Sequence, residues 1–152
     1  MIPSPHLKAL KMIITSLVDW VLTGSLAHAL HGVPVEVHDI DLQTNQEGAF
    51  EIERRLDAYS IRPVTYLDSG NIRSYFGRLC VDGVDIDIMG DIQKRLKDGS
   101  WDGPPDLNQH KCWIDFEGMH IPVLDLEYEV QTYQRMGRFE RAENLQRWLR
   151  GA

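Results

Sequence analysis

The segment WVLTGSLAHALHGVPVEVHDIDLQT, residues 20–44, organises the rest of the chain. Its apolar start ends at the turn Thr23-Gly24-Ser25, and a short helical pattern then runs to Gly32. After Pro34 the sequence alternates between two sets of residues, which predicts a strand that ends near Gln43. One set is Val35, Val37, Asp39 and Asp41, and the other is Glu36, His38, Ile40 and Leu42. The segment therefore predicts a strand, a tight turn, a short helix and a second strand.

Two aspartates, Asp39 and Asp41, share one face of the predicted second strand, because side chains two apart in a strand point the same way. Ile40 and Leu42 then point the opposite way, into a core. Neighbouring carboxylates are costly to ionise together unless a cation lies between them. Oxygen ligands of this kind suit a hard ion such as Mg²⁺. Any functional interpretation must explain this pair.

A second informative stretch runs from residue 72 to residue 89, where Asp82-Gly83 predicts a two-residue hairpin turn between apolar runs. The turn predicts these facing pairs: Val81–Val84, Cys80–Asp85, Leu79–Ile86 and Arg78–Asp87. One face of the hairpin is then apolar, and the other carries Arg78, Cys80, Asp85 and Asp87. We expect this polar face to form a wall of the site that contains Asp39 and Asp41.

The remaining sequence alternates between helical and strand patterns. Helices are predicted over residues 5–18, 47–59, 91–97, 125–136 and about 139–149, and strands over 20–23, 63–67 and 113–123. Ser4 and Asp91 are expected to cap the helices that follow them, and residues 98–108 form a loop. This mixture, with its hairpin, predicts an α+β or α/β fold with a central mixed sheet, flanking helices and a helical C-terminus.

Length and composition narrow the class of protein. A chain of 152 residues is expected to form one domain, residues 1–152, and 43% hydrophobic residues suit a globular core. The net charge of −7 and the lack of a basic cluster argue against an extended nucleic-acid surface. No apolar run approaches the ~18 residues of a membrane span. Cys80 and Cys112 lack metal-site spacing, which favours a reducing, cytoplasmic location.

The order strand, Gly24-Ser25 turn, short helix and Asp39-Ile40-Asp41 strand resembles the DNA polymerase beta-like nucleotidyltransferase superfamily. The compact members, minimal nucleotidyltransferases and AbiEii-like proteins, are the most similar in size. The resemblance covers residues 20–89, and residues 121–138 also look like the C-terminal part of that group. It implies a magnesium-dependent, nucleotide-binding transferase that moves a nucleoside monophosphate from a nucleoside triphosphate to a hydroxyl. The acceptor would be a small molecule, a protein or an RNA end.

The resemblance also implies a role for each matching residue. Gly24 and Ser25 would bind the triphosphate, because a turn without a Cβ lets backbone N–H groups approach phosphates. Asp39 and Asp41 would bind Mg²⁺, as one or two ions, together with Asp87. Asp87 would also orient or deprotonate the acceptor. Asp85 is the other candidate for this third carboxylate, and Asp87 is preferred because it lies in the strand interior.

Two departures from the family pattern leave a second hypothesis open. Many relatives carry a basic residue soon after the Gly-Ser pair, where this chain has Leu26, Ala27 and His28, and many have Ser where it has His38. The alternative is a catalytically inactive interaction module, such as a toxin–antitoxin component, so a protein partner or a homo-oligomer stays open. A metal-dependent phosphohydrolase would use His28, His31 and the His38-Asp39 pair. That family carries its His-Asp pair on a helix, whereas this pair is predicted in a strand.

Overall fold

The computed structural model describes residues 2–14 and 19–151. The strands are β1 Val21–Thr23, β2 Ile40–Thr44, β3 Ser60–Asp68, β4 Ile72–Val81, β5 Val84–Lys94, β6 Lys111–Phe116 and β7 Met119–Leu124. The helices are α1 Ser4–Ile14, α2 Gly24–Leu30, α3 Gln46–Arg55, α4 Leu126–Arg135 and α5 Phe139–Leu149, with 3₁₀ turns at Asp57–Tyr59 and Leu107–Gln109.

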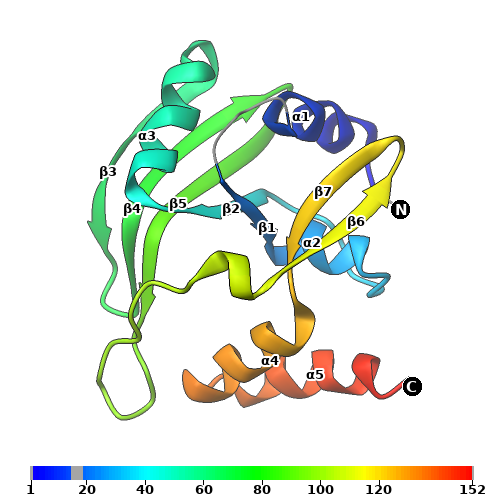
Figure 1. Cartoon of the computed structure of the whole chain (residues 1–152), viewed down its shortest axis with the longest axis vertical. Helices are drawn as coiled ribbons and strands as arrows, with labels where there is room; N and C mark the ends of the chain where they lie inside the picture. Colours follow the sequence, from blue (N-terminus) through cyan, green and yellow to red (C-terminus); the bar gives the residue numbers. More distant parts are fainter. Residues whose placement is uncertain (1, 15–18, 152) are drawn as a thin grey trace.

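The strands form one seven-stranded sheet in the order β3-β4-β5-β2-β1-β7-β6 (Figure 1). β2 lies antiparallel to β1 and parallel to β5, and β1 lies parallel to β7. The predicted α+β fold with a mixed sheet, flanking helices and a helical C-terminus is therefore confirmed. β2 and β5 are neighbours near the middle of the sheet, so their polar residues meet there.

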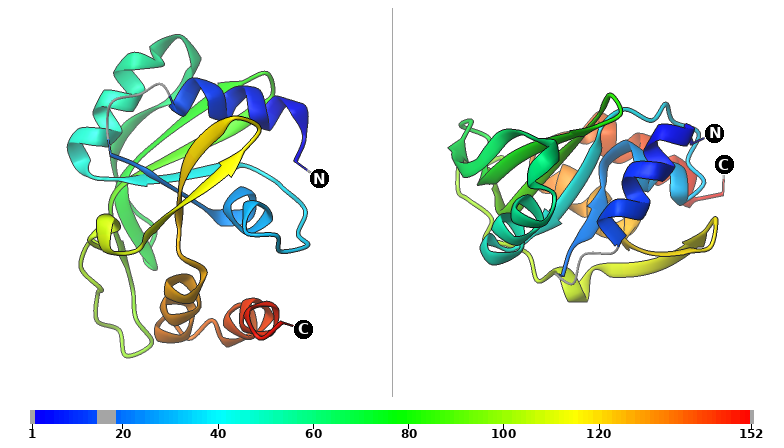
Figure 2. Two further views of the ribbon diagram at one scale, coloured as in Figure 1. Left: turned by 45° about the vertical axis from the view of Figure 1, so that its right-hand side comes forward. Right: turned by 90° about the horizontal axis from the view of Figure 1, so that it is seen from above.

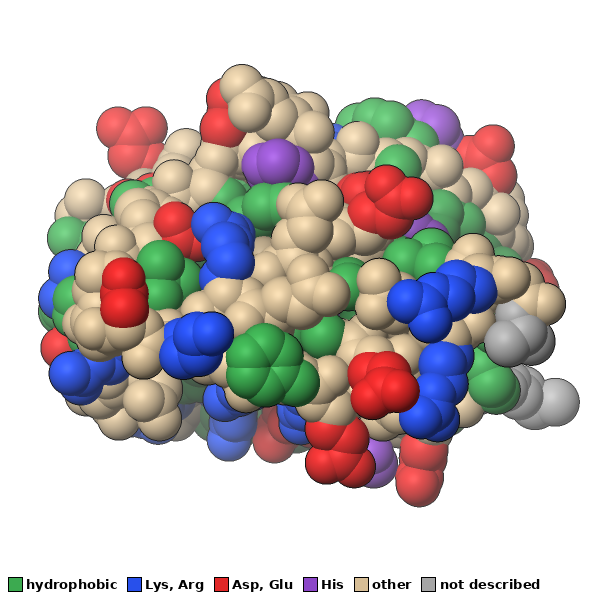
Figure 3. Space-filling model, turned by 90° about the horizontal axis from the view of Figure 1, so that it is seen from below, with side chains coloured by type: hydrophobic (Ala, Val, Ile, Leu, Met, Phe, Trp, Pro, Cys, Tyr) green, Lys and Arg blue, Asp and Glu red, His purple; other side chains and the backbone are tan. Residues whose placement is uncertain are grey.

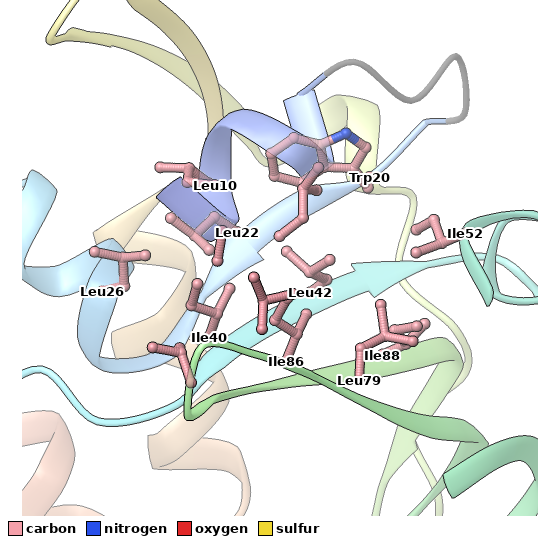
Figure 4. Close-up of a cluster of buried hydrophobic side chains, with 14 of the residues drawn as sticks. Leu10, Trp20, Leu22, Leu26, Ile40, Leu42, Ile52, Leu79, Ile86 and Ile88 are labelled. Atoms are coloured by element: carbon pink, nitrogen blue, oxygen red, sulfur yellow. The ribbon is translucent and has the colours of Figure 1, made fainter. Parts of the chain in front are cut away.

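The main hydrophobic core lies between the sheet and the helices α1, α2 and α3 (Figure 4). Ile40 and Leu42 of β2 are fully buried, as their alternation with the aspartates predicts. Ile86 and Ile88 of β5 are fully buried beside them. The odd-numbered residues that alternate with them, including Asp41 of β2 and Asp87 of β5, therefore point to the opposite face of the sheet, and Asp39 directly precedes β2.

The β4–β5 hairpin has the register that its turn predicts. The facing pairs are Val81–Val84, Cys80–Asp85, Leu79–Ile86 and Arg78–Asp87. Asp82 and Gly83 both have positive φ, 50° and 80°, which matches the primed turns of tight hairpins. Arg78 and Asp87 consequently face each other across the two strands.

The predicted helix over residues 91–97 is wrong, because β5 continues to Lys94. Alternating burial persists through Ile92, so this segment stays in the sheet. The Asp91 carboxylate caps another element: it accepts a hydrogen bond of 3.2 Å from the N–H of Gln46, at the start of α3.

Several element boundaries also differ from prediction. The carboxylate strand begins at Ile40, and residues 34–38 before it are irregular. α1 begins at Ser4, whose expected capping role is therefore wrong, and predicted helical residues 15–18 lie outside the described residues. α3 ends at Arg55, before a 3₁₀ turn. Asp125 does cap α4, accepting a hydrogen bond from the N–H of Tyr128.

α4 and α5 pack side by side, apart from α1 and α3, at the bottom of Figure 1 and in the left view of Figure 2. They share a second, small core of buried residues: Leu126, Val130, Ala142 and Leu145. Among the described helices, none has the length and apolarity that a membrane crossing requires. The helix pair thus forms a separate wall that faces the polar side of the sheet.

Candidate active site

A cavity of about 520 Å³ lies between the Gly-Ser turn and the C-terminal helices. From the sheet side it is lined by Gly24, Ser25, Asp39 and Asp41, which are four of the five predicted site residues. The opposite wall is formed by residues of α4 and α5: Tyr133, Arg141, Asn144 and Leu145. The volume falls within the range of about 300–1,000 Å³ typical of ligand sites.

Gly24 is required by the close approach of Asp41. Its φ is +75°, a conformation that disfavours residues with a Cβ. A Cβ added at this position would also overlap the Oδ2 atom of Asp41. The sequence suggested that the glycine leaves room for phosphate, whereas here it first leaves room for the carboxylate of β2.

Ser25 connects the turn to the chain before the aspartates. Its hydroxyl oxygen accepts a hydrogen bond of 2.9 Å from the N–H of His38. This contact fixes the approach of residue 39 to the cavity. The hydroxyl proton is still able to donate to a ligand, because a serine hydroxyl donates once and accepts twice.

Asp41 lies in an unfavourable electrostatic environment. Burial, and after it the neighbouring charges of Asp87 and Asp39, together raise the pKa of its carboxyl to about 7. Asp41 and Asp87 are direct register partners in the parallel β2–β5 pair, whose strands lie about 4.8 Å apart. The fold therefore brings the three predicted carboxylates into electrostatic contact.

Asp87 is held by Arg78 rather than exposed to the cavity. The guanidinium donates two hydrogen bonds to it, Nε to Oδ1 at 2.6 Å and Nη2 to Oδ2 at 3.1 Å. The Asp87 side chain is only 14% exposed, and this pairing raises the pKa of Arg78. Asp85 is 4.0 Å from the same guanidinium. Asp87 is thus placed beside Asp41 but does not line the 520 Å³ cavity.

The carboxylates have the donor chemistry that a hard divalent cation prefers. A cation between Asp39 and Asp41 would relieve the repulsion that raises the pKa of Asp41. Within residues 2–14 and 19–151, no three His, Cys, Asp or Glu side chains are arranged to share a metal. Asp87, whose two oxygens face Arg78, would have to turn toward Asp41 to complete such a set.

A buried network behind the cavity was not predicted from the sequence. Glu129 of α4 is 5% exposed and accepts a hydrogen bond from the hydroxyl of Thr23. Its other oxygen lies 2.5 Å from Nε2 of His28, which lines the cavity. His31, the residue after the end of α2, contacts the carbonyl of Leu124 instead, so His28 and His31 do not form a common metal site. In the sequence, Glu129 is one polar residue in an amphipathic helix, which gives no signal of this role.

The face that carries α4 and α5 shows acidic and basic side chains interspersed (Figure 3). This distribution matches the overall acidic composition, with a net charge of −7. Arginines of the helix pair nevertheless reach the site, since Arg141 lines the cavity opposite the aspartates. The helix pair therefore supplies positive charge to a site whose sheet side is negative.

Comparisons with known proteins agree with this arrangement. The sequence model of the family described as aminoglycoside-2''-adenylyltransferase matches residues 7–147. A Thermotoga maritima protein assigned as a nucleotidyltransferase has 49% identity and a TM-score of 0.84, with 100% of this chain and 97% of that chain covered. The lincosamide antibiotic adenylyltransferase LnuA, solved with lincomycin, has 15% identity and a TM-score of 0.57, covering 96% and 97%, and shares the fold. No curated protein matches the chain. The narrower resemblance to AbiEii-like proteins is not confirmed.

Proposed function

Because the chain belongs to the aminoglycoside-2''-adenylyltransferase family, a family of nucleotidyltransferases, we propose that it transfers a nucleoside monophosphate to a hydroxyl of a small molecule. The observation that carries this proposal is the 520 Å³ cavity in which the Gly-Ser turn meets Asp39 and Asp41. A concave site of this volume suits a small acceptor better than a protein or an RNA end. The family and the cavity together disfavour the inactive interaction module.

The proposed reaction is an in-line displacement at the α-phosphorus of the nucleoside triphosphate. The acceptor oxygen forms a bond to this phosphorus, while the bond to the oxygen that bridges to the β-phosphate breaks. Pyrophosphate leaves with the electron pair, and the hydroxyl proton passes to a carboxylate. Asp87 is the proposed proton acceptor, because it lies directly beside Asp41 on the neighbouring strand.

Each remaining site residue has a proposed role. The Gly24 turn and the Ser25 hydroxyl orient the triphosphate. Asp39 and Asp41, with Asp87 as a third ligand, would hold Mg²⁺, which when bound neutralises charge on the triphosphate and on the leaving pyrophosphate. His28, fixed by its contact with Glu129, borders the space for the acceptor.

Nucleotide binding tests the proposal first. Calorimetric titrations with ATP, GTP, CTP and UTP, each with and without Mg²⁺, are expected to show magnesium-dependent binding of at least one nucleotide. Asp39→Asn and Asp41→Asn should each abolish the magnesium dependence. Asp115→Asn, an exposed change on the β6–β7 hairpin, is the matched control and should bind like the native chain.

Transfer of label tests the acceptor class. A nucleotide labelled at the α-phosphate is incubated with the chain and a panel of hydroxylated small molecules, including aminoglycosides and lincosamides. Label on a small molecule supports the proposal, whereas label that follows protein or RNA assigns a different acceptor. If the native chain binds no nucleotide under any condition, the family fold is present here without its chemistry.

A further inference from the structure

A second, smaller cavity adjoins the first at the Gly24 turn. It measures about 220 Å³ and shares four lining residues with the larger cavity: Gly24, Asp41, Tyr133 and Arg141. Sites that hold a whole small ligand are usually at least about 300 Å³. The smaller cavity therefore has room for one end of a ligand that extends from the larger one.

A β-bulge directs Lys94 into this smaller cavity. Between the register pairs Tyr75–Gly90 and Arg73–Gln93, β5 contains one residue more than β4. Asp91 lies in this step with a φ of 49°, a left-handed conformation that aspartate tolerates better than most residues. One extra residue reverses which face the following side chains occupy. Lys94 consequently lines the cavity on the same side of the sheet as Asp41.

The smaller cavity concentrates positive charge in an acidic protein. Lys94, Arg138 and Arg141 line it, and none of the three forms an ion pair with a residue that the structure describes. Two carboxylates also line it, Asp41 and Glu129. Cations that converge on a confined space without carboxylate partners favour an anionic ligand there.

One of the two lining carboxylates, Glu129, is already engaged by polar neighbours. Glu129 accepts a hydrogen bond from the Thr23 hydroxyl, and its other carboxylate oxygen lies 2.5 Å from Nε2 of His28. Burial lowers the pKa of Lys94, although Glu129 and Asp102 favour its charged form. The Lys94 ammonium is thus held close to negative charge without a direct partner, a placement that an additional anion would stabilise.

A buried amide without a partner also points into the smaller cavity. Gln43 is 2% exposed and lines the cavity, yet its Oε1 atom has no hydrogen-bond partner among the described residues. Buried polar atoms without partners are rare in native proteins and indicate a missing ligand or water. The amide is able to present either its oxygen or its NH₂ group to a ligand after a half-turn.

We propose that the smaller cavity binds the β- and γ-phosphates of the nucleoside triphosphate, with Lys94, Arg138 and Gln43 as phosphate ligands. The identity of this ligand rests on the proposed function. The subsite places the α-phosphate at the junction of the two cavities, beside Gly24 and Asp41. It also accounts for the absence of a basic residue after the Gly-Ser pair, because the cations come from β5 and from the start of α5.

Inorganic tripolyphosphate is the probe that tests this subsite on the full chain. Calorimetry with Mg²⁺ present is expected to show binding that weakens about tenfold or more in Lys94→Met and about threefold or more in Arg138→Gln. Arg150→Gln, which removes an exposed arginine outside both cavities, is the control and should bind like the native chain. Gln43→Glu, which puts a negative charge at the amide position, should also weaken binding.

Two further measurements separate a phosphate-binding role from a structural one. The affinity for AMP, which lacks β- and γ-phosphates, should change less than about twofold in Lys94→Met. The melting temperature of this variant should equal or exceed that of the native chain, because the substitution removes a buried charge that has no partner. A variant that loses tripolyphosphate, AMP and thermal stability together would contradict the proposal.

The remaining outcomes distinguish this proposal from the proposed function. If the native chain does not bind tripolyphosphate, or if Lys94→Met binds it equally well, the subsite is wrong. If Lys94→Met transfers labelled nucleotide with the native KM, this result supports the nucleotidyltransferase function and contradicts the subsite. If tripolyphosphate binds through Lys94 but the chain transfers label from no nucleotide, this result supports the subsite and contradicts the proposed function.

Discussion

Asp41 combines several unfavourable contacts in one side chain. Its carboxylate is half-buried, faces Asp87 on the next strand and follows Asp39 by two residues. Gly24 leaves just enough room for it. Residues held in this way lower the stability of the free protein, and such costs are common at sites that are built for a ligand.

Stability should therefore depend on pH through Asp41. Its folded pKa is about 7 against an ordinary value of 3.8, so the folded state holds the proton more tightly and loses stability as pH rises from about 4 to 7. Asp41→Asn removes this loss and should be more stable than the native chain at pH 8, by up to about 4 kcal/mol. The two should differ little at pH 4.

Chemical denaturation at a series of pH values, with EDTA present, measures this difference. Asp115→Asn controls for the loss of one negative charge and should track the native chain. Added Mg²⁺ should narrow the gap at pH 8, because a cation beside Asp41 favours its ionised form. A gap that stays constant from pH 4 to pH 8 would show that Asp41 ionises normally.

The third carboxylate is distinguished by comparing Asp87→Asn with Asp85→Asn. Asp87 is the register partner of Asp41, whereas Asp85 lies two residues nearer the hairpin turn. If Asp87 accepts the proton of the acceptor, its amide variant should lose about 10²–10⁴-fold in kcat. Asp85→Asn should stay within a few-fold of the native chain. The opposite ranking in single-turnover assays would assign the role to Asp85.

At the scale of helices and strands, the sequence predicts local features best. The Asp82-Gly83 turn and the alternation around Asp39 and Asp41 depend on neighbouring residues, and both led to the observed faces of β5 and β2. The bulge at Asp91 was missed, because Asp91 reads equally well as a helix cap. Only its pairing with β4 and its contact with α3 decide between these conformations.

The site residues, too, divide into those that a local sequence pattern predicts and those that only tertiary packing brings to the cavity. Gly24, Ser25, Asp39 and Asp41 fall within one short segment, and the structure brings them to one cavity. The second wall comes from α4 and α5, about one hundred residues later in the chain. Its contribution, including Glu129 beside His28, depends on tertiary packing that no local pattern encodes.

The α4–α5 pair should be sensitive to a single core residue. Leu145 is 6% exposed, belongs to the small core of the pair and lines the larger cavity. Leu145→Ala should cost about 2–4 kcal/mol through lost packing. Hydrogen exchange should then accelerate mainly at amides of α5, while amides of β2 and β5 keep their protection.

Leu149→Ala is the matched control on the same helix. Leu149 is 41% exposed, so its truncation should change stability by less than about 0.5 kcal/mol. Equal acceleration across α5 and the sheet in Leu145→Ala would mean that the helices and the sheet unfold as one unit.

For the whole molecule, the net charge of −7 opposes the approach of a nucleoside triphosphate. At 10 mM salt the screening length is about 30 Å, so the entire protein repels the ligand, whereas at 150 mM it is about 8 Å. The association rate constant for Mg-ATP should therefore rise about two- to five-fold between these conditions. Stopped-flow measurements test this, and a rate that falls with salt would show that the cations of the site dominate at long range.

The separate core of the C-terminal helices has a consequence for evolution. α4 and α5 pack on each other through their own four buried residues, while α1, α2 and α3 stabilise the sheet that carries the aspartates. Cavity-lining residues of the helix pair, such as Asn144 and Arg141, are exposed and lie outside both cores. Substitutions there alter the shape of the acceptor space at little cost to the fold. If the proposed reaction is right, relatives of this chain are therefore able to diverge in their acceptors while the sheet that carries the aspartates stays the same.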